Sequence, residues 1–89
     1  MAIEETISEE KTIKLEFFAQ FREDRGIGSE AVRTASATPA ELYAELDARY
    51  HFRANRATTR IAVNDELAEW TRRLADGDTV VFLTPFGGG

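Results

Sequence analysis

Alternating apolar and polar residues predict a strand near the start of the chain. Over 13–18, Ile13, Leu15 and Phe17 fall on one face and polar residues on the other. Since successive side chains of a strand point to opposite faces of a sheet, this pattern is typical of a half-buried strand. Phe18 is the exception, because it falls on the polar face.

A capped, amphipathic helix is predicted over Pro39–Tyr50. Thr38 is a typical N-cap, Pro39 suits the first helical position, and Glu41 completes a capping-box pattern. Apolar residues then recur every fourth position and form one stripe toward the sheet: Leu42, Leu46 and Tyr50.

The other elements rest on shorter patterns. We expect a helical turn or loop over 19–28, a weaker strand over 31–35, an Arg-rich loop over 51–59 and a short strand over Arg60–Val63. Turn pairs follow at Asn64-Asp65 and Asp76-Gly77. Between these turns, a short and irregular helical segment is predicted from three residues at helical spacing: Leu67, Trp70 and Leu74.

The last strand, Thr79–Leu83, is strongly apolar, and Pro85 ends it. The first and last strands are the most apolar, so they should lie centrally as parallel neighbours with the helix crossing one face. This order is similar to a ubiquitin-like β-grasp, an α+β fold with a mixed sheet and one main helix on one face. We expect this domain over 12–84, a flexible N-terminal extension over 1–11 and a Gly-rich tail over 85–89.

Composition excludes several classes of function. The 89 residues suffice for one small domain, and a net charge of −5 disfavours nucleic-acid binding. No apolar run approaches the roughly 20 residues that span a membrane, and no signal-peptide pattern opens the chain, so we expect a cytoplasmic protein. Cysteine is absent, and the single histidine, His51, lies in a polar loop without a second ligand. We therefore expect no catalytic side chain, metal or cofactor.

The end of the chain is the unusual feature. Pro85 and Phe86 lead into Gly87, Gly88 and Gly89, which places the terminal carboxylate on a thin stalk. Glycine has no Cβ, so such a stalk can thread a narrow channel into another protein's active site. The alternative is an ordinary frayed terminus.

Three stretches of this sequence resemble the ubiquitin-like sulfur carriers, most closely the small subunit of molybdopterin synthase. The first, 13–23, has the double aromatic Phe17-Phe18 with a following Arg-Glu, and the second, 61–64, has a Val-Asn strand end. The third and most specific, 74–83, has an Asp-Gly-Asp turn and a last strand, followed by proline and the terminal di-glycine.

The resemblance implies a mechanism centred on Gly89. An ATP-dependent activating enzyme would adenylate its carboxyl group, and a sulfur donor protein would convert the adenylate to a thiocarboxylate. The tail residues Pro85, Phe86, Gly87 and Gly88 would thread the active site of the large catalytic subunit of molybdopterin synthase. There the sulfur would pass to a molybdopterin precursor. The chain would be a carrier or non-catalytic subunit.

Strand parity also predicts a docking surface. Phe18 lies opposite the core side of the first strand, and Leu83 lies opposite the core side of the last. If the strands are neighbours, Phe18 and Leu83 form an exposed apolar patch, joined by Leu67, of the kind that marks a protein interface. The alternative is that a loop or the N-terminal extension covers it.

Other functions share the same tail. The sulfur could serve thiamine, cysteine or transfer-RNA thiolation, or Gly89 could form isopeptide bonds as a protein modifier. A non-covalent binding module is a third possibility, and it would not need Gly88 and Gly89.

Overall fold

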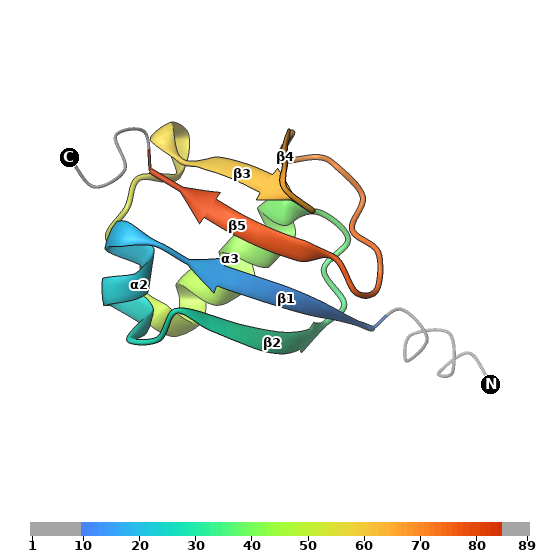
Figure 1. The fold of residues 1–89 in the computed structure, drawn as a ribbon, viewed down its shortest axis with the longest axis horizontal. Helices are drawn as coiled ribbons and strands as arrows, with labels where there is room; N and C mark the ends of the chain where they lie inside the picture. The colour runs from blue at the N-terminus through green and yellow to red at the C-terminus, as the bar shows by residue number, and fades with distance from the viewer. Residues whose placement is uncertain (1–9, 85–89) are drawn as a thin grey trace.

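Five strands form one mixed sheet that packs on a single long helix (Figure 1). The computed structural model describes residues 10–84. Its elements, in chain order, are β1 (Lys11–Phe17), α2 (Ala19–Arg25), β2 (Ser29–Thr34), α3 (Pro39–Tyr50), the 3₁₀ turn η1 (Arg56–Thr58), β3 (Arg60–Val63), β4 (Glu66–Ala68) and β5 (Thr79–Leu83).

The first and last strands are parallel neighbours at the centre of the sheet, as predicted. The strand order is β2-β1-β5-β3-β4, and only the β1–β5 pair is parallel. The α+β β-grasp arrangement is therefore confirmed. β1 begins at Lys11, one residue inside the span predicted as an extension.

The core lies between the sheet and α3. The inward residues of β1, β5 and β3 meet the apolar stripe of α3, and six aromatic rings join them: Phe17, Phe21, Tyr43, Phe52, Trp70 and Phe82. The ring of Phe82 lies 5.3 Å from that of Tyr43 and 5.7 Å from that of Phe21, centroid to centroid. These rings tie β5 to both helices.

The start of α3 follows the predicted capping pattern with one difference. The Thr38 hydroxyl accepts a hydrogen bond from the Glu41 N–H at 3.3 Å. The Glu41 carboxylate, however, accepts from the N–H of Ala37 and not from that of Thr38, at 2.8 Å. The predicted helix bounds, Pro39–Tyr50, are those observed.

The helical segment predicted from Leu67, Trp70 and Leu74 is wrong. Asn64 and Asp65 both have positive φ angles, 53° and 72°, and Val63 pairs with Glu66, so the chain reverses in a two-residue hairpin. Leu67 consequently lies in β4. The chain from Trp70 to Leu74 is irregular. The two residues have helical spacing because each packs separately on the core, Trp70 partly buried and Leu74 buried.

Two other elements differ in extent. The helical turn or loop expected over 19–28 contains a true helix, α2, that ends at Gly26 with a φ of 87°. The weaker strand expected over 31–35 runs instead over Ser29–Thr34. It is longer because its pairing with β1 begins at Ser29, although its own pattern is weak.

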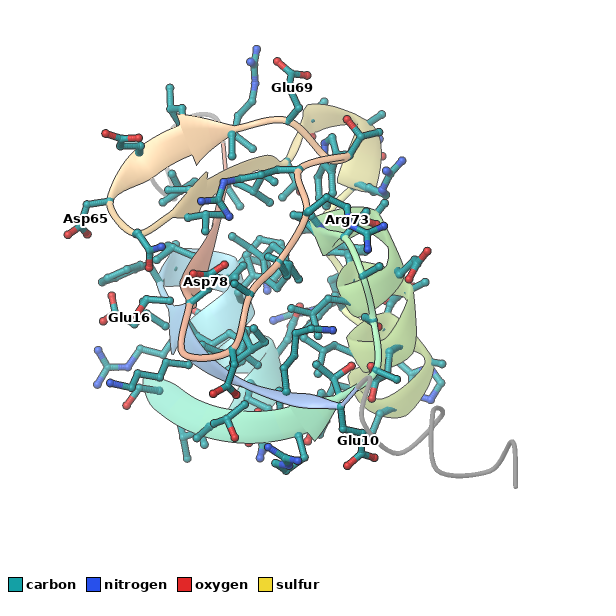
Figure 2. The ribbon with its side chains drawn as sticks, turned by 90° about the vertical axis from the view of Figure 1, so that its right-hand side faces the viewer. Glu10, Glu16, Asp65, Glu69, Arg73 and Asp78 are labelled. Carbon is teal, nitrogen blue, oxygen red and sulfur yellow. The ribbon has the colours of Figure 1, made fainter. Side chains whose placement is uncertain are left out.

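The loop before β5 is held by a buried carboxylate, Asp78. Its oxygens accept hydrogen bonds from the Ala75 N–H (2.8 Å), the Asn64 amide (2.9 Å) and the Arg72 guanidinium (3.2 Å). Burial raises the pKa of Asp78, but these three donors outweigh it and hold the pKa below its usual value. Figure 2 shows Asp78 within this loop, at the end of the sheet remote from α2.

Asp78→Asn should therefore lower stability and flatten its pH dependence. Because the pKa of Asp78 is lower in the folded than in the unfolded protein, its ionised carboxylate stabilises the fold at pH values above the unfolded pKa of about 4. This stabilisation is lost as the pH falls through the pKa of the folded protein. We expect a loss of about 1.5–3 kcal/mol near neutral pH, the range for hydrogen bonds to charged groups.

Urea unfolding at a series of pH values measures this effect. Asp65→Asn is the matched control, since it removes an exposed carboxylate from the neighbouring turn. Equal losses in the two variants at neutral pH would show that Asp78 does not hold the loop.

No helix in the described residues, 10–84, is long and apolar enough to cross a bilayer.

Candidate functional site

The candidate site begins where β5 ends. Phe17 pairs with Phe82 in the parallel β1–β5 register, so Phe18 and Leu83 follow at neighbouring positions on the outer side of the sheet. Phe18 is 50% exposed, and Leu83 is partly exposed. Both lie at the end of the sheet that carries α2 (Figure 1). The predicted threading residues Pro85, Phe86, Gly87 and Gly88 and the reacting Gly89 lie outside the described residues.

The helix α2 keeps Phe18 outside the core. Phe18 is extended (φ −129°, ψ 158°) and is the N-cap of α2, and Phe21, one turn later, is fully buried. The Phe21 ring lies 5.1 Å from the Phe52 ring, edge to face. Because Phe17 and Phe21 fill the core on either side, Phe18 remains on the surface.

A salt-bridged carboxylate secures the other side of α2. Asp24 accepts hydrogen bonds from the Arg53 backbone N–H and from its guanidinium, both at 2.7 Å, and from Gln20 at 3.1 Å. Burial raises the pKa of Asp24, but these donors outweigh it and lower the pKa overall. This contact links α2 to the chain after α3 at the end of the sheet where β5 terminates.

An apolar band crosses the outer face of the sheet beside this end. Val81 of β5 pairs with Ala62 of β3, and Ala62 pairs with Leu67 of β4, so these three side chains share the outer face. Leu67 is 75% exposed, whereas Val81 is buried among its neighbours. Glu16 is the β1 partner of Val81, and Figure 2 shows it on the side of the sheet away from α3.

The structure thus places the three predicted patch residues on one face, but not as one contact. Phe18 and Leu83 lie together, and Leu67 lies two strands from Leu83, across β3. Sequence reasoning missed Val81 and Ala62, which connect them. Val81 could have been predicted, because it lies two residues before Leu83 in the strand Thr79–Leu83 and therefore on the same face.

Two further residues were missed at the same end. Arg60 is the cross-strand neighbour of Leu83, and Arg56 of η1 places its guanidinium carbon 4.3 Å from the centre of the Trp70 ring. His51, predicted to lie at the surface, is exposed at the C-cap of α3. Within 10–84, no group of three or more acidic or imidazole side chains could hold a metal ion.

Solved structures with this fold include two archaeal proteins. The Haloferax volcanii HVO 2177 protein is 28% identical with a TM-score of 0.76, over 90% of this chain and 88% of its own. The putative molybdopterin converting factor, subunit 1, from Pyrococcus furiosus is 27% identical with a TM-score of 0.72, over 84% of this chain and 98% of its own.

A third similar structure is a protein–protein complex. It contains subunits 1 and 2 of the molybdopterin-converting factor from Helicobacter pylori, and the matched chain is 26% identical with a TM-score of 0.61, over 88% of this chain and 99% of its own. No curated protein matches the sequence.

The family comparison covers most of the chain. The model of the ThiS family matches residues 15–89, from the middle of β1 to the final glycine. It therefore includes the apolar band, the end of β5 and the glycine tail. The chain belongs to the ThiS family of ubiquitin-like sulfur carriers.

Proposed function

We propose that the Gly89 carboxyl group carries sulfur as a thiocarboxylate and donates it to a molybdopterin precursor. The observation that supports this most is the family match, because it runs through the terminal glycines and not only through the folded domain. The similarity to subunits of two molybdopterin-converting factors favours this acceptor over those of other sulfur pathways.

The chemistry requires activation of the carboxylate. A Gly89 carboxylate oxygen attacks the α-phosphorus of ATP on the activating enzyme, and pyrophosphate leaves. The resulting acyl adenylate has a good leaving group. Sulfur at the sulfide oxidation level, delivered by a sulfur donor protein, then adds to the carbonyl carbon. The C–O bond to AMP breaks with its electron pair, which leaves the thiocarboxylate and AMP.

The domain's own contribution is to dock and to present the tail. The described residues contain no cysteine nucleophile, and the exposed Phe18 lies at the end of the sheet where β5 terminates. We propose that Phe18, Leu83 and Leu67, with Val81 and Ala62 between them, form the surface that binds the activating enzyme and the large synthase subunit. Pro85, Phe86, Gly87 and Gly88 would then thread the partner's active site and bring Gly89 to the reacting atoms.

Pyrophosphate exchange tests this proposal. The purified activating enzyme should exchange labelled pyrophosphate into ATP only when the full chain is added. Addition of the large synthase subunit, a sulfur donor protein and the precursor should then give a product that contains the transferred sulfur. Exchange without product formation would retain the carrier role and contradict the molybdopterin acceptor. Attachment of the chain to lysines of other proteins would indicate a modifier instead.

Gly88→Val should block adenylation without preventing docking. A β-branched side chain widens the tail and restricts its backbone, so it should not pass through a narrow channel. Because the apolar surface is unchanged, the variant should still bind the activating enzyme and compete with the native chain. We expect pyrophosphate exchange to fall by at least about a hundredfold, the cost of misplacing a reacting group. Pyrophosphate exchange at the native rate would mean that the activating enzyme has no channel narrow enough to exclude a side chain at position 88.

A further inference from the structure

The stretch 48–64, from the last turn of α3 through β3, is rich in arginine and lies outside the proposed tail chemistry. It contains Arg49, Arg53, Arg56 and Arg60, and no aspartate or glutamate occurs between Asp47 and Asp65. Arg49 and Arg53 are compensated, since Arg49 forms an ion pair with Glu45 at 3.7 Å and Arg53 one with Asp24 at 2.7 Å. The positive charge that remains is therefore that of Arg56 and Arg60.

Neither of these two arginines forms an ion pair with any residue in 10–84. Both are exposed. The Arg56 guanidinium lies 4.3 Å from the centre of the Trp70 ring, a cation–π contact that restrains its position. Arg60 is fixed at its backbone by its place in β3 opposite Leu83. Two uncompensated guanidinium groups in an acidic chain are available to an anionic partner group.

A hollow of about 520 Å³ is lined by Arg60 and by Trp70, whose ring Arg56 contacts. It forms because β4 stops pairing with β3 at Ala68, and the following chain turns toward α3, where the Trp70 carbonyl accepts the Ala40 N–H at 3.1 Å. Its floor and walls comprise Ala57, Thr58, Thr59, Arg60, Ile61, Ala68, Glu69 and Trp70. The volume admits a partner's side chains, and among the described residues that line it Arg60 is the one cation and Glu69 the one carboxylate.

The hollow lies beside the point where the tail leaves the domain. Arg60 is paired with Leu83, the last residue of β5, and η1 and the end of β5 occupy the same end of the molecule (Figure 1). Neighbouring strands are about 4.8 Å apart, so a partner that holds the tail must also cover Arg60.

We propose that the hollow receives an aspartate or glutamate side chain from the activating enzyme, at the mouth of the channel that takes the tail. This inference rests on the proposed carrier function. A guanidinium group binds a carboxylate through two parallel N–H donors, and Arg56, held on Trp70, adds a second positive charge at the rim. The chain carries a net charge of −5, so a local pair of positive groups beside the end of β5 favours one orientation of an acidic partner group.

Glu69 and Arg60 carry opposite charges, so their substitutions should have opposite effects on binding of the activating enzyme. Glu69 lines the same hollow as Arg60 without forming an ion pair with it, and Figure 2 shows it on the β4 side of the domain. It should repel an incoming carboxylate. Arg60→Gln should therefore weaken binding of the activating enzyme, and Glu69→Gln should strengthen it.

Calorimetric titration of the full chain with the purified activating enzyme measures both effects. At low salt we expect Kd to rise about three- to tenfold for Arg60→Gln and to fall about twofold or more for Glu69→Gln. The differences should shrink at about 0.3 M salt, because exposed charges are screened. Arg73→Gln is the control: it removes an equal, exposed charge from the 71–78 loop, which lies at the start of β5 and not at its end (Figure 1).

Equal weakening by Arg60→Gln and Arg73→Gln would overturn the proposal, and so would weaker binding by Glu69→Gln. Because these side chains are exposed, thermal unfolding should match that of the wild type, and Glu69→Gln is decisive even if Arg60→Gln is unstable. Such results would leave the carrier function intact, since wild-type binding and pyrophosphate exchange would persist. Failure of the wild-type chain itself to bind would contradict the proposed function and this inference with it.

Discussion

Removing Gly89, or adding one residue after it, should abolish sulfur transfer and leave thermal stability unchanged. The reacting atom in the proposed mechanism is the terminal carboxyl carbon, so a shifted terminus places it away from ATP. Misplacing a reacting group by about 1 Å can already cost a hundredfold in rate, and a whole residue spans more than 3 Å. Within residues 10–84 the core cluster runs from Ile13 to Phe82, and we expect the fold not to depend on Gly89.

The matched control carries the same added residue before Met1. Sulfur transfer and pyrophosphate exchange should be retained in this variant and lost in the C-terminal one, with both melting at the wild-type temperature. Full sulfur transfer by the chain extended after Gly89 would refute the proposed role of the terminal carboxyl group.

Phe82→Ala should have the largest effect on stability, and Phe18→Ala should act mainly on binding. Phe82 is fully buried and its ring contacts those of Phe21, Tyr43 and Trp70. Its truncation leaves a cavity and should cost about 3–5 kcal/mol. Phe18 is half exposed, so its truncation should cost about 1 kcal/mol or less and weaken binding of the activating enzyme about tenfold or more.

Urea unfolding measures the stability of the Phe82→Ala and Phe18→Ala variants, and calorimetric titration measures their binding to the activating enzyme. If Phe18→Ala unfolds as readily as Phe82→Ala, the assignment of Phe18 to a docking surface is wrong. If it is stable and binds normally, the apolar surface has no part in docking.

Elements with a strong local pattern were predictable from the sequence. Thr38, Pro39 and the apolar stripe of α3 gave its bounds, and Arg60–Val63 and Thr79–Leu83 were predicted with the ends observed. Parity along β1 and β5 also placed Phe18 and Leu83 on the outer face, because alternation in a strand is fixed by backbone geometry.

Features that depend on the positions of other segments were not predictable. Leu67 belongs to a hairpin whose register is set by the Asn64-Asp65 turn. Leu74 is buried and Trp70 packs partly buried against the core, and the irregular chain between them happens to give helical spacing. The hollow lined by Arg60 and Trp70 forms because the chain diverges from β3 after Ala68. Arg56 of η1 contacts the Trp70 ring, although the two residues are far apart in the sequence. No local pattern signals such a contact.

Mass spectrometry of the intact chain, purified from its native cells, tests the central claim most directly. We predict a population heavier than the free carboxylate by one sulfur-for-oxygen exchange, located at Gly89 by fragmentation and lost when the activating enzyme is deleted. Only unmodified carboxylate in cells that are making the sulfur-containing product, or a branched Gly-Gly remnant from this chain on lysines of other proteins without any thiocarboxylate, would contradict it.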